Sequence, residues 1–417
     1  MVWVALRRLK LVFLLHKRPD QGRVLASSCF TMALAIAWLS ACSLPVVTTR
    51  PAALFPSQTA IPSSAPVGTE AEHSAGMPSR SGVIGGFRTT GSLATGRGGC
   101  PAILLPNGQV LLAGGEDGAP LATAELYDPL LGRFSPTGHM STPRDLYSGV
   151  LLKNGKVLLA GGEAFSSPLA SADLYDPVTG VFRETGSLSK ARLDGASAML
   201  ADGRVLVAGG YAGPTEGVLG SAELYDPITG GFLPAGSMTL PRYLAAATLL
   251  ADGRVLITGG YRTQREGPTV SAELYDPRSG RFTTTGSMGT ARAAHSATLL
   301  ADGEVLIAGG IGDRGPLQTA ELYDPATGTF SAVGSMAEAR SGRIGAIRLL
   351  DGRVLMIGGS ESPSTELFDP PTGTFVVAAP MSVAHPGSGV ALLADGRVLV
   401  AGSGDPEGRA VAEVYVP

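Results

Sequence analysis

Cysteine is scarce in this sequence of 417 residues, which contains only three. Cys29 and Cys42 lie near the N-terminus, and Cys100 alone falls in the long segment that follows. A single cysteine permits neither an internal disulfide framework nor a zinc or iron–sulfur site built from a cysteine cluster. A buried apolar core must supply the stability instead, and 44% of the residues are hydrophobic.

Basic residues are few outside the first 41 positions. Those positions hold six of the 32 Lys and Arg residues and one acid, so the rest of the chain has 26 basic and 34 acidic residues and a formal charge of -8. Nucleic-acid binding requires clustered Lys and Arg that displace counterions. We therefore predict no nucleic-acid partner.

The common catalytic motifs are also missing. We find no Gly-x-Ser-x-Gly elbow, Walker loop, His-Glu-x-x-His helix or dinucleotide fingerprint in a strand–turn–helix context, which weakens hydrolase, nucleotide-binding and metalloprotease interpretations. We assign no catalytic residue, no metal site and no cofactor.

The N-terminus has the order of an export signal. Basic residues up to Arg23 precede an uncharged apolar run over residues 24–39, as in a secretory signal. The run ends in Leu39-Ser40-Ala41-Cys42, which resembles a bacterial lipobox and implies that Cys42 carries a lipid. An uncleaved signal anchor is the alternative, because residues 24–41, about 18 positions, are just long enough to span a bilayer. Both alternatives predict an extracytoplasmic protein held at the membrane of the cell envelope.

Residues 42–83 are rich in Pro, Ser, Thr and Ala and lack apolar periodicity. Such a composition is typical of a flexible tether. We therefore divide the chain into a signal peptide or anchor (1–41), a tether (42–83) and a folded domain (84–417).

One sequence motif recurs through the folded domain. A Gly-Gly pair follows each apolar run, then an Ala-Glu-Leu-Tyr-Asp-Pro phrase and an aromatic residue. The pairs begin at Gly114, Gly161, Gly209, Gly259, Gly309 and Gly358, with a degenerate seventh at Gly402. This period of about 44–50 residues indicates a propeller or solenoid.

Each repeat predicts four antiparallel strands. Asp302-Gly303 and its equivalents suit hairpin turns that need a positive φ. A third strand then ends at Tyr323-Asp324-Pro325, and a fourth follows. Four antiparallel strands make one propeller blade.

These residues resemble the kelch repeat family, whose units carry the Gly-Gly pair, a Tyr-Asp-Pro-like strand end and an aromatic in the fourth strand. The resemblance covers residues 84–417 and implies a β-propeller. The sequence departs from the family by placing Phe, as at Phe282, where Trp is usual. Either ring can fill the space between blades.

Counting the strands predicts how the ring closes. The last repeat stops at Tyr415 without a fourth strand, whereas residues 86–93 match fourth strands elsewhere. We predict an all-β, seven-bladed propeller closed by this N-terminal strand, which hides the sheet edges. The expected blades are about 97–140, 144–188, 192–238, 242–288, 292–336, 340–381, and 385–417 with 84–93.

Residues that recur in every blade are expected to serve the scaffold. An arginine opens the first strand of six blades, and His385 takes its place in the seventh. We expect salt bridges between blades or, alternatively, a cationic ring at one channel mouth that attracts an anionic ligand. The arginines are Arg97, Arg144, Arg192, Arg242, Arg292 and Arg340.

Positions that differ between blades are the candidates for specificity. The position three residues after the arginine varies, and so does the connection from the second to the third strand, as in residues 261–270. Both should lie on one face, where aromatic and charged residues suit polar or protein ligands. The variable position holds Cys100, Tyr147, Gly195, Ala245, His295, Arg343 and Ser388.

From these positions we predict a binding or scaffolding protein that recognises a protein or glycan on one propeller face. The predicted ligand-binding residues are Tyr147, Tyr261, Arg262, Arg265, Glu266, His295, Arg343 and His385.

A carbohydrate-active enzyme is the alternative. The resemblance extends distantly to galactose oxidase, whose copper is held by two histidines and two tyrosines, one of them cross-linked to a cysteine. The folded domain has only His139, His295 and His385 and the lone Cys100, with no spacing that favours copper. A sugar mutarotase would need only an acid–base pair, for which Glu266, His295 and Arg343 are candidates.

Overall fold

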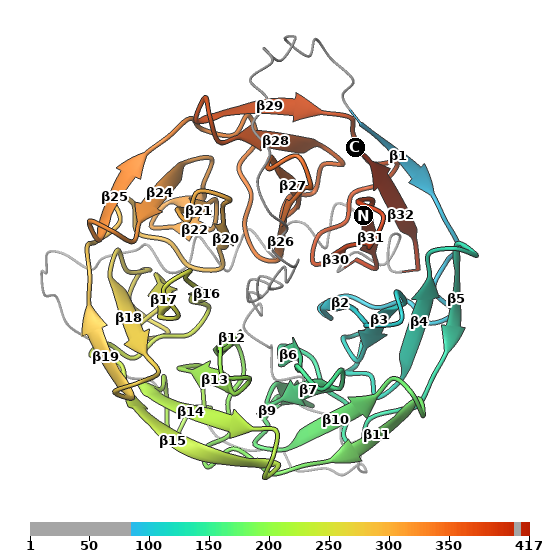
Figure 1. The fold of residues 1–417 in the computed structure, drawn as a ribbon, viewed down its shortest axis with the longest axis horizontal. Coiled ribbons are helices and arrows are strands. Elements are labelled where there is room, and N and C mark those ends of the chain that lie inside the picture. The colour runs from blue at the N-terminus through green and yellow to red at the C-terminus, as the bar shows by residue number, and fades with distance from the viewer. Residues whose placement is uncertain (1–84, 404–409) are drawn as a thin grey trace, which may run out of the picture. The chain divides into compact units, whose positions relative to one another are not determined.

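Seven four-stranded antiparallel sheets form a ring in the computed structural model (Figure 1). The structure describes residues 85–403 and 410–417. The predicted signal segment, the tether and Cys42 lie outside these residues. The all-β fold class and the seven-bladed propeller predicted from the repeats are confirmed. Among the described residues, none belongs to a helix that is long and apolar enough to cross a bilayer.

The first four blades follow one another along the chain, and in each the strand nearest the ring centre comes first (Figure 1). Blade 1 comprises β2 (Ala102–Leu104), β3 (Val110–Ala113), β4 (Ala124–Asp128) and β5 (Arg133–Pro136). Blade 2 comprises β6 (Ser148–Leu151), β7 (Val157–Ala160), β10 (Ala172–Asp176) and β11 (Val181–Glu184). Blade 3 comprises β12 (Ala196–Met199), β13 (Val205–Ala208), β14 (Ser221–Asp226) and β15 (Gly231–Ser237). Blade 4 comprises β16 (Ala246–Leu249), β17 (Val255–Thr258), β18 (Ala272–Asp276) and β19 (Arg281–Thr284).

The last three blades repeat this order, and two small hairpins project from the connections. Blade 5 comprises β20 (Ser296–Leu299), β21 (Val305–Ala308), β24 (Ala320–Asp324) and β25 (Thr329–Ala332). Blade 6 comprises β26 (Ile344–Arg348), β27 (Val354–Gly358), β28 (Thr365–Asp369) and β29 (Thr374–Ala378). Blade 7 comprises β30 (Gly389–Leu392), β31 (Val398–Ala401), β32 (Ala412–Val416) and β1 (Gly86–Thr89). The hairpins are β8 (Glu163–Ala164) with β9 (Ser167–Pro168), and β22 (Ile311–Gly312) with β23 (Gly315–Pro316).

The two ends of the described chain meet in blade 7. Strand β1 pairs antiparallel with β32, from Gly86 opposite Val416 to Thr89 opposite Glu413. The Phe87 ring packs on Tyr415 with their centroids 5.1 Å apart. The outer strand of the last blade therefore comes from the beginning of the folded domain.

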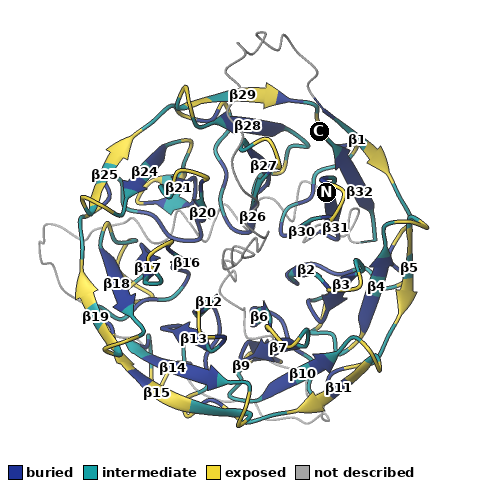
Figure 2. Ribbon diagram, in the orientation of Figure 1, coloured by how far each residue is buried: buried dark blue, intermediate teal, exposed yellow. Residues whose placement is uncertain are grey.

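Burial explains why the sequence alternates in some strands and not in others. The second strand of a blade, such as β17, is buried at every position because it lies between two strands and between two neighbouring blades. The outermost strand, such as β19, is mostly exposed. Figure 2 shows this change from buried inner strands to exposed rim in every blade.

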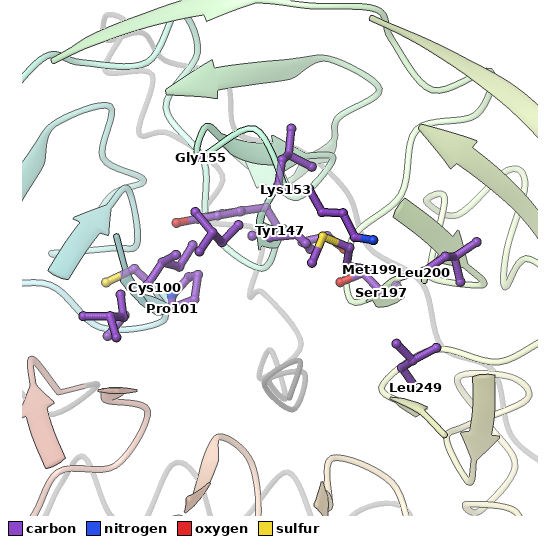
Figure 3. A pocket seen from close by; sticks show the side chains of 18 of the residues that line it. Cys100, Pro101, Tyr147, Lys153, Gly155, Ser197, Met199, Leu200 and Leu249 are labelled. Carbon is purple, nitrogen blue, oxygen red and sulfur yellow. The ribbon is translucent and has the colours of Figure 1, made fainter. Parts of the chain in front are cut away.

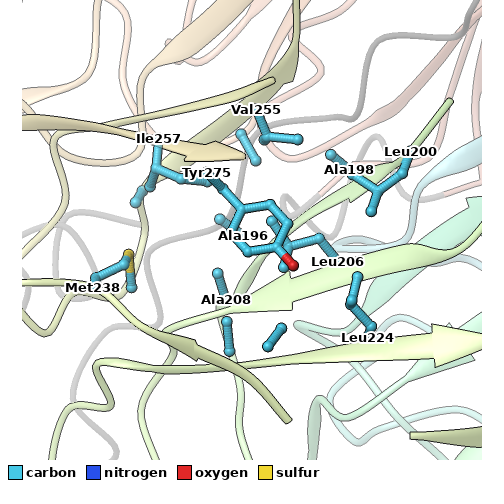
Figure 4. Packing of buried hydrophobic residues seen from close by; sticks show 14 residues of the cluster. Ala196, Ala198, Leu200, Leu206, Ala208, Leu224, Met238, Val255, Ile257 and Tyr275 are labelled. Atoms are coloured by element: carbon cyan, nitrogen blue, oxygen red, sulfur yellow. The ribbon is translucent and has the colours of Figure 1, made fainter. Parts of the chain in front are cut away.

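Neighbouring blades pack through their apolar faces. Between blades 3 and 4, Leu206 and Leu224 lie against Ile257 and Tyr275 (Figure 4). The Tyr275 ring also packs on Phe282 of its own blade, with centroids 4.8 Å apart. The fourth-strand phenylalanines thus occupy the space between blades, as expected.

A hydrogen bond links the rims of several blade pairs. The Thr285 hydroxyl lies 2.9 Å from the Tyr323 hydroxyl of the next blade, and three further threonine–tyrosine pairs have the same geometry. In the next interface Val333 replaces the threonine and Phe368 replaces the tyrosine, and both pack in one apolar cluster. Because both partners are apolar there, no hydroxyl is left unpaired.

Candidate functional site

The arginine that opens each first strand is buried within its own blade. Arg242 is only 1% exposed and donates from Nη1 to the Gly259 carbonyl at 2.9 Å and from Nη2 to the Glu273 carboxylate at 2.7 Å. Glu273 also accepts the backbone N–H groups of Thr239 and Leu240, at the entrance to the blade. The pair therefore joins the first strand, the third strand and the incoming connection.

The same ion pair recurs around the ring, with Nη2–carboxylate distances between 2.7 and 3.2 Å. The other five pairs are Arg97–Glu125, Arg144–Asp173, Arg192–Glu223, Arg292–Glu321 and Arg340–Glu366. The expectation of bridges between blades is wrong, because both partners belong to one blade. The exposed cationic ring is also wrong, because the guanidinium groups are buried against their carboxylates.

His385 takes the arginine's place in blade 7. Its Nδ1 lies 2.8 Å from the Gly402 carbonyl oxygen and its Nε2 lies 3.2 Å from the Glu413 carboxylate. The imidazole is fully buried. The structure thus places this predicted ligand-binding residue in the scaffold's ion-pair position and not on an open surface.

The residue two positions after the arginine has a left-handed backbone in all seven blades, with φ between +51° and +83°. In three blades it is glycine, but Leu146, Asp194, Leu244 and Ala294 adopt the same conformation although a Cβ disfavours it. The N–H of Ala294 donates to the Leu244 carbonyl at 2.9 Å, which links blade 5 to blade 4. The next residue is the variable position predicted from the sequence.

A cavity of about 920 Å³ lies at the ring centre and is lined by residues of the first strands and the segments that flank them. Among the residues at the variable position, Cys100, Tyr147, Gly195, Arg343 and Ser388 line it. Two predicted ligand-binding residues, Tyr147 and Arg343, are therefore brought together. Figure 3 shows Cys100 and Tyr147, from the neighbouring blades 1 and 2, in its wall.

Arg343 reaches the cavity through an extra residue. Nine positions separate Arg340 from Leu349, the last apolar residue before the hairpin, whereas eight separate the equivalent residues in every other blade. The Ile344 N–H donates to the Gly342 carbonyl at 2.9 Å, so Arg343 is the central residue of a tight turn. Strand β26 then pairs in register from Ile344 opposite Gly358. Ile344, and not Arg343, is thus the structural equivalent of the variable residue.

The sequence did not single out the rest of the cavity wall. Ser197, Met199 and Leu249 occupy alternate positions of the first strands and point inward, and Lys153 lies at the hairpin end (Figure 3). Their period of two was a usable signal, because alternate residues of an innermost strand must face the centre. Lys153 donates to the Ala201 carbonyl of the next blade.

His295 lies outside the cavity wall. It is 1% exposed, and its Nε2 lies 2.8 Å from the Thr258 hydroxyl. Burial, together with Arg292 and Arg242, lowers the pKa of His295 to about 3. The imidazole is therefore neutral in the folded protein across the physiological range.

This lowered pKa predicts a loss of stability in acid. Between about pH 6.5 and pH 3 the unfolded chain binds a proton at His295 that the folded chain does not, so stability falls as the pH falls. The loss should approach about 1 kcal/mol per pH unit. Urea unfolding of His295→Asn between pH 7 and pH 4.5 should show a shallower decline than the unchanged protein. Identical slopes for the variant and the unchanged protein would contradict the prediction.

A strip of three tyrosines lies on the face where the first strands begin. The Tyr211 and Tyr243 ring centroids are 6.0 Å apart, and those of Tyr243 and Tyr261 are 5.5 Å apart. All three rings are partly exposed. Burial, with a contribution from Asp313, raises the pKa of Tyr261 to about 12. The phenol therefore stays protonated and can donate a hydrogen bond.

The other predicted residues follow this strip on the connection from β17 to β18. Arg262, Arg265 and Glu266 are exposed, and Arg262 Nε lies 4.0 Å from the Glu266 carboxylate. The Thr263 hydroxyl accepts the backbone N–H groups of Arg265 and Glu266, which bends the loop. Glu266 thus lies on an open loop and His295 in the interior, so neither joins Arg343 in the cavity wall.

Three comparisons relate the chain to known proteins. The kelch motif family model matches residues 292–337, which contain blade 5. No curated protein matches the chain. The solved structure of a novel fungal alcohol oxidase of the AA5 family, in complex with copper, matches with a TM-score of 0.65 and 18% sequence identity over 80% of this chain and 77% of that one. At this identity the likeness concerns the fold.

The residues of this chain do not fit the copper of that oxidase. Among residues 85–403 and 410–417, no group of three or more His, Cys, Asp or Glu side chains could hold a metal ion. His295 is bonded to Thr258, and both ring nitrogens of His385 contact other scaffold groups. Tyr147 donates its hydroxyl proton to the Ala113 carbonyl at 2.5 Å. We therefore derive no reaction step through copper.

Proposed function

Because the chain is a kelch-repeat β-propeller, we propose that it is an extracytoplasmic binding or scaffolding protein. It recognises a protein or glycan partner on the face that bears the tyrosine strip, and it is held at the membrane through its N-terminus, by a lipid on Cys42 or by an uncleaved anchor. The membrane attachment rests on the sequence alone.

The tyrosine strip is the observation that carries this proposal. The repeat does not require tyrosine at these positions, since the residues equivalent to Tyr211 and Tyr261 are Glu116 in blade 1 and Ile311 in blade 5. Tyrosine offers a large rigid contact surface and a hydrogen-bonding hydroxyl, and it is enriched at binding hot spots. The exposed loop with Arg262 and Glu266 extends the same surface with polar groups.

The test is binding of the full chain to a glycan array and to fractionated envelope proteins. The change Tyr261→Ser with Arg262→Glu should weaken a specific partner at least about 30-fold, because it removes an aromatic anchor and reverses a charge beside it. The control is Arg278→Glu, an exposed arginine at the turn between β18 and β19 on the opposite face of the same blade. Equal loss with both variants, or no loss with either, would contradict the proposed face.

The carbohydrate-active enzyme remains the second proposal. The fold likeness to a copper-dependent alcohol oxidase favours it, whereas the histidine contacts described above oppose an oxidase of that kind. Sugar turnover by the same preparation, abolished by Arg343→Gln, would support the enzyme over the binding protein.

A further inference from the structure

The charged groups on the cavity wall all have one sign. Of the described residues that line the cavity, Arg343 and Lys153 are charged, and none is Asp or Glu. Arg343 lies toward the face with the tyrosine strip, where the first strands begin, and Lys153 lies at the hairpin end of the channel. A cavity with cations and without carboxylates on its wall favours an anionic guest.

The paired arginines behind the wall influence two groups of the wall. Burial raises the pKa of the Cys100 thiol, with a smaller contribution from Glu125, whereas Arg97 and Arg343 lower it. Burial and Cys100 raise the pKa of Tyr147, while Arg343, Arg144 and Arg97 lower it. The paired arginines of blades 1 and 2 thus still favour negative charge at the inner wall.

The carboxylates nearest this region lie behind the wall. Burial lowers the pKa of Arg343, and Cys100, Asp194, Tyr147 and Asp145 oppose that shift. Asp194 and Asp145 do not line the cavity. The Arg343 side chain thus belongs to the cavity wall, and neither of these two aspartates does.

A hydroxyl accompanies the guanidinium. Ser388 lines the cavity and is 5% exposed, and its Oγ forms no hydrogen bond with the described residues. A buried hydroxyl without a partner is costly, and a guest acceptor would relieve that cost. Ser388 and Arg343 belong to neighbouring blades, 7 and 6, so both can face the same head group.

Between these two ends the first strands contribute apolar side chains to the wall. Ile103, Leu151, Met199 and Leu249 come from four successive first strands and line the cavity together. The volume of about 920 Å³ is in the range of small-molecule pockets. This wall can accommodate a hydrocarbon body of the guest.

We propose that the central cavity binds an amphiphilic organic acid, with its carboxylate at Arg343 and Ser388 and its hydrocarbon body against the apolar first strands. Arg343 provides a planar pair of donors that suits a carboxylate. The extra residue in blade 6 places that guanidinium in the channel without disturbing the scaffold's own arginine, Arg340. This site is separate from the tyrosine strip and does not depend on the partner proposed for it.

The test is isothermal titration calorimetry of the full chain with dodecanoate below its critical micelle concentration. We expect one site with a dissociation constant on the order of 10 µM. Dodecanol, which has the same body without the charge, should bind at least about tenfold more weakly. Equal binding of both probes, or no binding of dodecanoate, would overturn the proposal.

Variants locate the site. Arg343→Gln should weaken dodecanoate at least about tenfold, and Arg343→Lys should retain part of the affinity because the charge remains. Met199→Trp should exclude the hydrocarbon body. The control is Arg348→Gln, which changes an arginine on the same strand that is absent from the cavity wall. Folding is checked by circular dichroism, and undiminished dodecanoate binding by a folded Arg343→Gln variant would disprove the site.

Discussion

Replacing Arg242 by methionine is expected to destabilise the propeller by about 3–5 kcal/mol, the usual effect of breaking a buried ion pair. The substitution leaves the Glu273 carboxylate charged and buried, with only the Thr239 and Leu240 N–H groups as donors. It also leaves the Gly259 carbonyl without its guanidinium donor. Equilibrium urea unfolding should show a lower midpoint with little change in the slope.

A surface pair in the same blade supplies the control. Arg254 and Asp252 approach to 2.6 Å, but their side chains are 37% and 44% exposed. Arg254→Met should cost less than about 1 kcal/mol, because water screens such pairs. The double variant Arg242→Met with Glu273→Met should recover part of the loss, since it removes the unpaired charge. Similar losses for the buried and the exposed arginine would refute this account.

Removing residues 84–89 is expected to destabilise the ring and to expose a sheet edge. The deletion removes the pairing of β1 with β32 and the packing of Phe87 on Tyr415. Loss of one large aromatic contact and several strand hydrogen bonds should cost about 5 kcal/mol. The unpaired edge of β32 should also promote self-association, because open strand edges recruit other strands.

Thermal unfolding and light scattering of the full chain measure both effects. Deletion of residues 76–81 shortens the predicted tether by the same number of residues and should leave the melting temperature unchanged. The variant without residues 84–89 should melt at least about 5 °C lower and should aggregate as the protein concentration rises. A monomeric protein with unchanged melting would mean that the ring does not depend on this strand.

The repeat period predicted the fold from the sequence, whereas both interpretations of the recurring arginines were wrong. The acidic partner of the arginine occupies the second position of the Ala-Glu-Leu-Tyr-Asp motif in every blade, as Glu273 does in blade 4. An arginine and a carboxylate that recur once per blade predict one pair per blade. Without that step, a buried scaffold contact resembled a ligand-binding ring.

The candidate site was only partly predictable. Sequence differences between the blades identified Tyr147 and Arg343, because positions that the repeat does not need for its fold can vary. Counting forward from the arginine aligned Arg343 with Tyr147. Counting back from Leu349 would have revealed the insertion, because Arg340 lies nine positions before it and not eight. The tyrosine strip arises from two different repeat positions, those of Tyr243 and Tyr261, which meet only after β16 and β17 pair. The cavity depends on how side chains from several blades leave space, which sequence spacing does not encode.

The insertion at Arg343 has a genetic consequence. In six of the seven blades the segment between the buried basic residue and the hairpin has the same length. In blade 6 this segment is one residue longer. Loss of the single Arg343 codon would therefore remove a guanidinium from the channel and restore the length of the other blades, and the strand register resumes at Ile344. Blade 6 thus accommodates one additional residue at this point without a change in the pairing of its strands.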